Sequence, residues 1–236
     1  MNELLLIASL LVSFGAVLFA YRFFGKGGLF AMTAFCTMAA NIEVMILVNA
    51  FGMEQTLGNV LFGASFLITD ILSENESKKD ADRAVSLGIF VTVLFIVFTQ
   101  GWMLYTPAPG DTVMPAVRTL FRGTPRVMLV SIAVYAVTQR FDVWLYHKWW
   151  SFSNKKWGDS HRFLWLRNNG STMVSQLLNA SLFTFGAFAG TYSLPVLLSI
   201  CGSSYLIFFV TALLDTPVAY LARRMKKSMQ SGENPT

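Results

Sequence analysis

One apolar stretch of the sequence carries a regular series of polar side chains. The polar positions are spaced four, four, three and four residues apart, and they are Ser131, Tyr135, Gln139, Asp142 and Tyr146. Because an α-helix repeats every 3.6 residues, all five side chains are expected on one face of one helix. A polar face on an otherwise apolar helix indicates the wall of a cavity. The alternative is hydrogen bonding between packed helices, which Ser and Gln side chains also provide.

Three other apolar runs also contain polar side chains, and these are Asn41 in the first run, Ser65, Thr69 and Asp70 in the second, and Ser175, Gln176 and Asn179 in the third. A carboxylate inside a membrane span costs about 2.5–3.5 kcal/mol on insertion scales, so such side chains are expected to face the protein interior or water. Glu43 points about 200° away from Asn41 on a helix. We therefore expect Glu43 to pair with a cation elsewhere, such as Arg140.

These residue types suit the recognition of a flat heterocycle. Carboxylates accept hydrogen bonds from N–H and amino groups, whereas Asn and Gln side chains both donate and accept. Phe and Tyr rings offer surfaces for stacking. A purine-like heterocycle matches this set better than a sugar or a phosphate does.

The composition places these residues in a membrane protein. The chain has 236 residues, of which 54% are apolar and only 13% are charged, and its mean hydropathy is +0.53. A soluble domain carries about twice that share of charged residues. The chain is therefore expected to be all-α, a single polytopic membrane helix bundle over residues 1–227, followed by a disordered cytoplasmic tail over residues 228–236.

Runs of about 20 apolar residues predict seven membrane spans. Their expected positions are Leu4–Tyr21, Leu29–Phe51, Leu57–Leu72, Ala84–Tyr105, Val127–His147, Ser171–Gly190 and Leu194–Ala222. Most of the 18 Lys and Arg residues face the cytoplasm if the N-terminus is outside and the C-terminus inside, which predicts that orientation. The polar residues then lie between the midplane and the cytoplasmic side, where secondary transporters form their sites. The outer segment Thr106–Arg126 is expected to lie across the interface or to fold over the bundle.

Several common functional motifs are absent from the sequence. It contains neither a GxxxxGK[ST] phosphate-binding loop nor an HExxH motif. Its histidines, His147 and His161, are expected at the membrane interface, and Cys36 and Cys201 show no metal-ligand spacing. The net charge of +5 follows from the membrane orientation, and no basic stripe with aromatic residues indicates nucleic-acid binding. We therefore expect no cofactor, no metal, no nucleic-acid partner and no enzyme activity.

Several short motifs resemble the queuosine precursor transporter family. In chain order they are Ala40–Val44, Thr56–Asn59, Ser65–Glu74, Thr124–Arg126, Tyr135 with Gln139 and Asp142, Trp165–Asn169, Ser171–Thr172 with Ser175–Gln176, and Gly186–Gly190. The resemblance covers roughly Phe30–Ala222, so the first helix is expected to be an addition to a six-helix core. The sequence departs from the family pattern at Glu76–Lys78, at Asn179, which is typically Asp, and at Met45, which is often Lys.

The resemblance implies uptake of 7-deazaguanine compounds across a bacterial plasma (inner) membrane for queuosine modification of tRNA. The substrate would be 7-cyano-7-deazaguanine, 7-aminomethyl-7-deazaguanine or queuine. Asp70 or Asp142 would accept from the guanine-like edge, and the amides and hydroxyls would complete the site. The implied binding residues are Asn41, Ser65, Thr69, Asp70, Tyr135, Gln139, Asp142, Ser175, Gln176 and Asn179, with stacking by Phe66 or Phe183. The implied gate or ion-pair residues are Arg126, Glu74, Glu43 and Arg140.

Two other functions fit the same residues. One is the substrate-binding subunit of an energy-coupling-factor importer for a vitamin or modified base, which would need an ATPase coupling module as its partner. The other is a membrane-embedded enzyme that uses Asp70, Glu74 and Asp142 as a metal or acid–base site. A purely structural bundle would bind no ligand. Besides the substrate and the lipid bilayer, the expected partners include a second copy of the chain, as a homo-oligomer.

Overall fold

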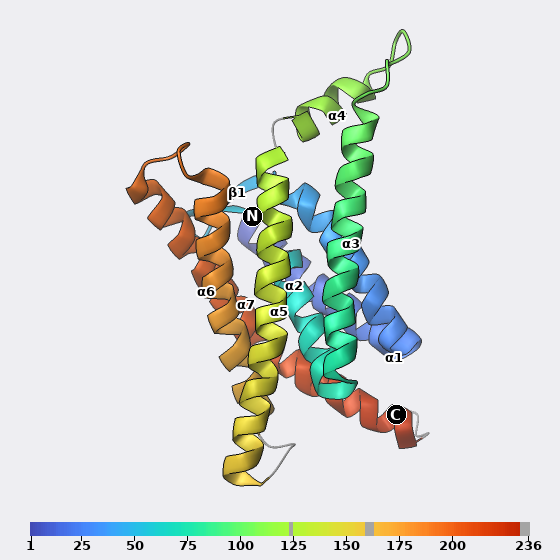
Figure 1. The fold of residues 1–236 in the computed structure, drawn as a ribbon, viewed down its shortest axis with the longest axis vertical. Coiled ribbons are helices and arrows are strands. Elements are labelled where there is room, and N and C mark those ends of the chain that lie inside the picture. The colour runs from blue at the N-terminus through green and yellow to red at the C-terminus, as the bar shows by residue number, and fades with distance from the viewer. Residues whose placement is uncertain (123–124, 159–162, 232–236) are drawn as a thin grey trace.

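Seven helices and one β-hairpin make up the structure, a computed structural model that describes residues 1–122, 125–158 and 163–231 (Figure 1). Their bounds are α1 (Asn2–Glu43), β1 (Leu47–Ala50), β2 (Met53–Thr56), α2 (Gly58–Asn75), α3 (Lys78–Trp102), α4 (Val113–Arg122), α5 (Pro125–Trp157), α6 (Leu164–Phe188) and α7 (Leu194–Ser231). The expected helical class is confirmed. The hairpin is an element that the apolar periodicity did not predict.

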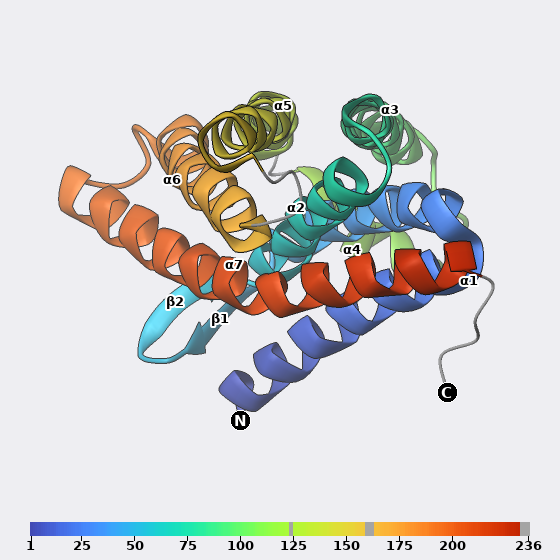
Figure 2. The same ribbon diagram turned by 90° about the horizontal axis from the view of Figure 1, so that it is seen from below.

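Helix α1 contains the first two predicted spans. Its backbone leaves the helical conformation at Gly25, with φ 58° and ψ −144°, so residues 2–24 and 26–43 form two helical segments. Figure 2 shows the chain turning back at this point. A Cβ atom on Gly28 would collide with the carbonyl oxygen of Ala20, so glycine at position 28 allows the two segments to approach closely.

The second segment of α1 ends at Glu43, earlier than the predicted span, which extended to Phe51. The intervening residues pair instead as an antiparallel hairpin, with Leu47 opposite Thr56. Its two-residue turn has positive φ at Phe51 (54°) and at Gly52 (73°), as a type I′ turn requires. The predicted boundary was therefore wrong, because a short apolar run such as Val44–Val48 does not by itself distinguish a strand from a helix.

Helix α2 is enclosed by the other helices. It contacts α1, α3, α5, α6 and α7, and Figure 2 shows it between them. Fifteen of its 18 residues are buried, the polar Ser65, Thr69 and Asp70 among them. Because its neighbours surround it, α2 can carry polar side chains without exposing them to lipid.

Four helices, α1, α3, α5 and α7, are long and apolar enough to cross a membrane by length and composition. Their outer faces carry exposed apolar side chains, such as Phe90 and Val97 of α3, as lipid contact requires. These features support a multi-pass membrane protein. Seven spans and the orientation stay predictions, because α2 and α6 are rich in buried polar residues.

The two ends of the bundle differ from each other. One end holds the hairpin and α4, where Phe121 packs against Phe95 and Trp102 of α3 (Figure 1). The other end holds the turn between α2 and α3 and the C-terminal part of α7. Residues 228–231 continue α7, and the disordered tail stays a prediction. The predictions for Thr124, His161 and residues 232–236 lie outside the described residues.

Candidate functional site

Two adjoining cavities lie inside the bundle and share Ala40, Phe62 and Ser131 in their walls. The larger has a volume of about 60 Å³ and lies among α1, α2, α5, α6 and α7. The smaller has a volume of about 20 Å³ and reaches α3. The polar and aromatic residues that line them include Asn41, Asn59, Phe62, Ser65, Ser131, Tyr135, Asn179, Phe183 and Phe208.

A third and wider cavity of about 370 Å³ adjoins the larger one at the hairpin end. The two share Thr56, Phe188, Ile200 and Ser204 in their walls. The hairpin contributes Leu47 and further residues to this outer cavity. A path of connected hollows therefore leads from the hairpin end to Ser65 in the middle of α2.

Three polar groups lining these cavities have no hydrogen-bond partner among the described residues. They are the side-chain oxygen of Asn41, the side-chain nitrogen of Asn59 and the hydroxyl of Tyr135. A buried polar group without a partner is unfavourable by roughly 1–3 kcal/mol, so a ligand that supplies the partners gains affinity. The set contains an acceptor, a donor and a hydroxyl that can do both.

A layer of hydrogen bonds follows directly below the smaller cavity. The amide of Gln139 donates to the hydroxyl of Ser65 at 2.7 Å, and its oxygen accepts from Thr69 at 3.2 Å. All three side chains are buried. The polar face predicted for residues 131–146 thus points into the bundle, where its outer part lines the cavities and its inner part bonds α5 to α2.

Three carboxyl groups from three helices lie beyond this layer, and each is at most 2% exposed: Asp70 of α2, Asp142 of α5 and Asp215 of α7. Asp70 accepts from the Thr172 hydroxyl at 3.0 Å, and Asp215 accepts from the Asn168 amide at 2.6 Å. Asp70 and Asp142 interact directly with each other, the charge of Asp215 acts on Asp70, and the charge of Asp142 acts on Asp215.

Asp142 and Ser175 differ from their neighbours in being left without partners. Neither carboxyl oxygen of Asp142 nor the hydroxyl of Ser175 has a hydrogen-bond partner among the described residues. Ser175 and Ser171 of α6 lie beside the Asp142 carboxyl. Within the described part of the chain, no three His, Cys, Asp or Glu side chains are placed to hold a metal ion.

A buried ion pair lies one helical turn after Asp70, toward the end of α2. Glu74 accepts two hydrogen bonds from Arg167 at 2.8 and 2.9 Å and one from the Tyr146 hydroxyl at 2.6 Å. Arg223 of α7 lies 3.5 Å from the same carboxylate. The Arg167 guanidinium also stacks over the Trp150 ring at 4.5 Å. Glu74 therefore joins α2 to α5, α6 and α7.

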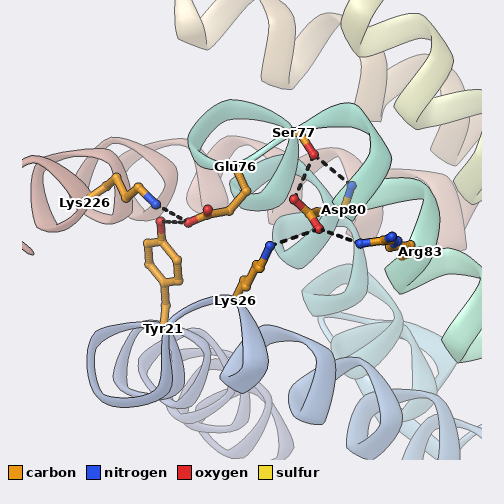
Figure 3. Close-up of polar contacts among 7 residues, drawn as sticks. All are labelled: Tyr21, Lys26, Glu76, Ser77, Asp80, Arg83 and Lys226. Carbon is orange, nitrogen blue, oxygen red and sulfur yellow. Dashed lines mark hydrogen bonds and ion pairs between the residues drawn. The ribbon is translucent and has the colours of Figure 1, made fainter. Parts of the chain in front are cut away.

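The final level joins the turn between α2 and α3 to α1 and α7 (Figure 3). Glu76 accepts from Tyr21 at 2.8 Å and from Lys226 at 2.6 Å. Asp80 accepts from Ser77 at 2.8 Å and pairs with Lys26 at 3.4 Å. The Ser77 hydrogen bond, followed by Lys26, lowers the pKa of Asp80 below its ordinary value of 3.8. These contacts close this end of the bundle, whereas the hairpin end has the open cavities.

Most of the predicted binding residues lie together along this axis. Gln176 is buried beside Asn179, whose amide donates to it at 3.4 Å. Phe183 lines the larger cavity as expected. Phe66 is fully buried and lines none of these cavities, and Phe62, one helical turn away, is the ring that lines both inner ones.

The residues predicted to form a gate or ion pairs behave differently from one another. Glu74 forms the buried ion pair described above. Arg126 donates to the backbone carbonyls of Gly186 and Ala189 and so ties the start of α5 to the end of α6. Arg140 is exposed, and the described residues show no ion pair between it and Glu43.

Sequence reasoning missed Asp215, although the rule that selected Asp70 also applies to it. Asp215 interrupts the apolar run of residues 206–222 and was the comparable signal in α7. The aromatic residues of the cavities carried no such signal, because the chain has 21 Phe residues. The partner of Glu74 is 93 residues away in sequence, so no local spacing pointed to Arg167.

Comparison with known proteins gives two matches over most of the chain. Residues 56–222 match a family described as "Putative vitamin uptake transporter". A Bacillus subtilis (strain 168) protein named "Probable queuosine precursor transporter" is 42% identical over 216 residues, which cover 91% of this chain and 92% of that protein. No solved structure gives a significant match. Both descriptions name a transporter and neither names an ATPase-coupled subunit or an enzyme, so they support neither alternative.

Proposed function

Because the chain belongs to the queuosine precursor transporter family, we propose that it imports a 7-deazaguanine precursor of queuosine through the two adjoining inner cavities. The candidate substrates are 7-cyano-7-deazaguanine, 7-aminomethyl-7-deazaguanine and queuine. The proposed location is the bacterial plasma (inner) membrane, with the hairpin end outside.

The observation that carries this proposal is the set of unpartnered polar groups in the cavity walls. The Asn59 amide and the Tyr135 hydroxyl can donate to the carbonyl oxygen and ring nitrogens of a guanine-like base. The Asn41 oxygen can accept from its N–H or amino group. Phe62 and Phe183 offer rings against which a planar base can stack.

The volumes indicate that transport requires the helices to move. The inner cavities of about 60 and 20 Å³ hold a few water molecules, whereas pockets for small ligands span roughly 300–1,000 Å³. The outer cavity of about 370 Å³ is large enough to admit a base at the hairpin end. We infer that substrate enters there, and that the ion pairs of Glu74 and Glu76 separate before it leaves at the other end.

The test is uptake in bacterial cells that neither make nor import queuosine precursors. Cells that express this protein should restore queuosine in their tRNA when supplied with a 7-deazaguanine, and not when supplied with guanine. The variant Asn41→Leu removes the unpartnered acceptor and keeps a side chain branched at the same carbon, and the matched control Ser86→Ala removes an exposed hydroxyl of α3. We expect uptake to fall about tenfold or more in Asn41→Leu, which corresponds to about 1.4 kcal/mol, and to be unchanged in the control.

Binding to the purified protein identifies the substrate. A ligand present at about 100 times its Kd adds about 2.7 kcal/mol to a reversible unfolding equilibrium, so the true ligand should raise the thermal midpoint measurably. A shift with one 7-deazaguanine and not with guanine would support the proposal. Folded protein that shows no shift with any of them, and no restored uptake, would refute it.

A further inference from the structure

The direct contact between Asp70 and Asp142 is not explained by the substrate cavities. Both carboxyl groups are buried, at 1% and 0% exposure, and neither lines the two inner cavities. Gln139, Ser65 and Thr69 lie between them and the smaller cavity. The pair therefore lies next to the proposed substrate site without being part of its walls.

Among the described residues, no Lys, Arg or His side chain figures in the interactions of Asp70 or Asp142. Two neighbours of the pair are themselves acidic or phenolic, namely Tyr146 of α5 and Asp215 of α7. Helix α6 contributes hydroxyl groups to the surroundings of the pair, those of Ser171, Thr172 and Ser175. No charged side chain of α1 or α3 figures among the interactions of Asp70 or Asp142 in the described chain. The cations Arg167 and Arg223 lie one helical turn further along α2, where both pair with Glu74.

Two facing carboxylates in a buried, uncompensated site repel each other strongly. One bound proton removes this repulsion, as it does when two carboxyl groups share a site in other proteins. It also supplies the missing donor, because a protonated carboxyl can donate to its neighbour. Both carboxyl oxygens of Asp142 and one of Asp70 have no hydrogen-bond partner among the described residues, so a proton on either acid would give the pair a donor that it lacks.

We propose that Asp70 and Asp142 form the binding site of a coupling proton, and that this protein is a proton–substrate symporter. This inference rests on the proposed function. One O–H bond forms on a carboxyl oxygen when the proton arrives from the outer side. The same bond breaks when the proton passes to water on the inner side, and no electrons are transferred.

Gln139 offers a physical connection between the two sites. It donates to Ser65, which lines the smaller cavity, and accepts from Thr69, which precedes Asp70 in α2. A substrate that bonds to Ser65 competes with Gln139 and shifts the α5–α2 contact that holds Asp142 against Asp70. Binding of substrate and binding of the proton are therefore expected to depend on each other, with reciprocal effects.

The experiment measures uptake of radiolabelled substrate by purified protein in liposomes, with an imposed pH gradient and the membrane potential held at zero. We expect an inward proton gradient to raise initial uptake at least tenfold, and substrate binding in weakly buffered solution to change the external pH. In Asp142→Asn a neutral amide replaces one of the two acids, so the repulsion between two carboxylates that makes the pair bind a proton is absent. This variant should keep substrate exchange across the membrane and lose the response to the gradient.

Two further variants complete the design. Asp70→Asn tests the other member of the pair, in case the first variant is poorly made. Asp82→Asn removes a carboxylate on α3 that lies outside these sites and should respond to the gradient as the parent does. Because Asn resembles a neutral carboxyl group in size, Asp70→Asn and Asp142→Asn should unfold close to the parental temperature.

The outcomes separate this inference from the proposed function. Parent protein that takes up a 7-deazaguanine without any response to the proton gradient would overturn the proton site and leave the transport function intact. A response to a sodium gradient in place of the proton gradient would overturn it too. Asp142→Asn protein that is folded but no longer binds substrate would make Asp142 a substrate ligand and also contradict the proposal. The absence of uptake and binding for every 7-deazaguanine would refute the proposed function itself.

Discussion

The variant Glu74→Gln tests whether the bundle depends on its buried ion pair. The Glu74 side chain is 3% exposed and that of Arg167 is 0% exposed. Gln has nearly the same volume as Glu, so the change removes the charge and leaves the packing. It also leaves a buried guanidinium beside a neutral amide, and removal of one partner of a buried pair costs about 3–5 kcal/mol.

The variant Glu76→Gln, in the partly exposed ion pair with Lys226, gives the comparison. Glu76 and Lys226 are 15% and 25% exposed, and their nitrogen–oxygen distance of 2.6 Å is shorter than that of the buried pair. Solvent screens this pair, so Glu76→Gln is expected to cost about 1 kcal/mol. Burial, and not distance, should therefore decide which substitution matters.

Thermal unfolding of purified protein, followed by tryptophan fluorescence at one scan rate, provides the assay. For a chain of this size, 1 kcal/mol corresponds to about 2–4 °C in Tm, so Glu74→Gln should lower Tm by about 6–20 °C and Glu76→Gln by about 2–4 °C. Neutralising both partners, in Glu74→Gln with Arg167→Gln, should cost less than the sum of the single changes. Equal shifts for Glu74→Gln and Glu76→Gln would refute the reasoning.

Two further predictions concern the same end of the molecule. Because the Ser77 hydrogen bond, and then nearby cations, lower the pKa of Asp80, its carboxylate stabilises the fold above about pH 3.8, and this contribution is lost as the pH falls through the lowered value. Asp80→Asn should thus lower Tm at pH 7, and its deficit against the parent should shrink as the pH falls below 3.8; a deficit that stays constant with pH would contradict the assignment. Gly28→Ala should lower stability by about 1–3 kcal/mol through overpacking, whereas Gly15→Ala, whose Cβ meets nothing within 4 Å, should lower it little or not at all. Equal Tm values for the two alanine variants would contradict the close approach at Gly28.

The helical period predicted the orientation of residues well. It brought Gln139 and Asp142 to one buried face, because the geometry of a helix fixes which side chains align. The cost of a charge in lipid likewise predicted that Asp70 is buried. Both inferences rest on local rules that hold whatever surrounds the helix.

Features that depend on contacts between distant segments could not be predicted in this way. Phe62 and Phe66 are spaced by one helical turn and share a face, so periodicity does not say which one borders a cavity. Whether Glu74 pairs with Arg167 or another cation depends on how α2 and α6 pack. The sequence predicted two spans on either side of residues 22–28 but not the residue at which the chain reverses. The reversal is at Gly25, and its position depends on the backbone conformation, which the apolar pattern does not record.

The enclosure of α2 has a consequence for how the protein is made. Helix α2 has Asp70 and Glu74 in its second half and is not among the described helices that are apolar enough to cross a membrane by composition, so on its own it inserts into lipid less favourably than its neighbours α1 and α3. Its neighbours α5, α6 and α7 are synthesised after it. During synthesis, helix α2 is therefore expected to contact only α1 and α3 until the second half of the chain emerges from the ribosome. Truncated chains that end before α5 are expected to be the forms that membrane quality-control proteases remove.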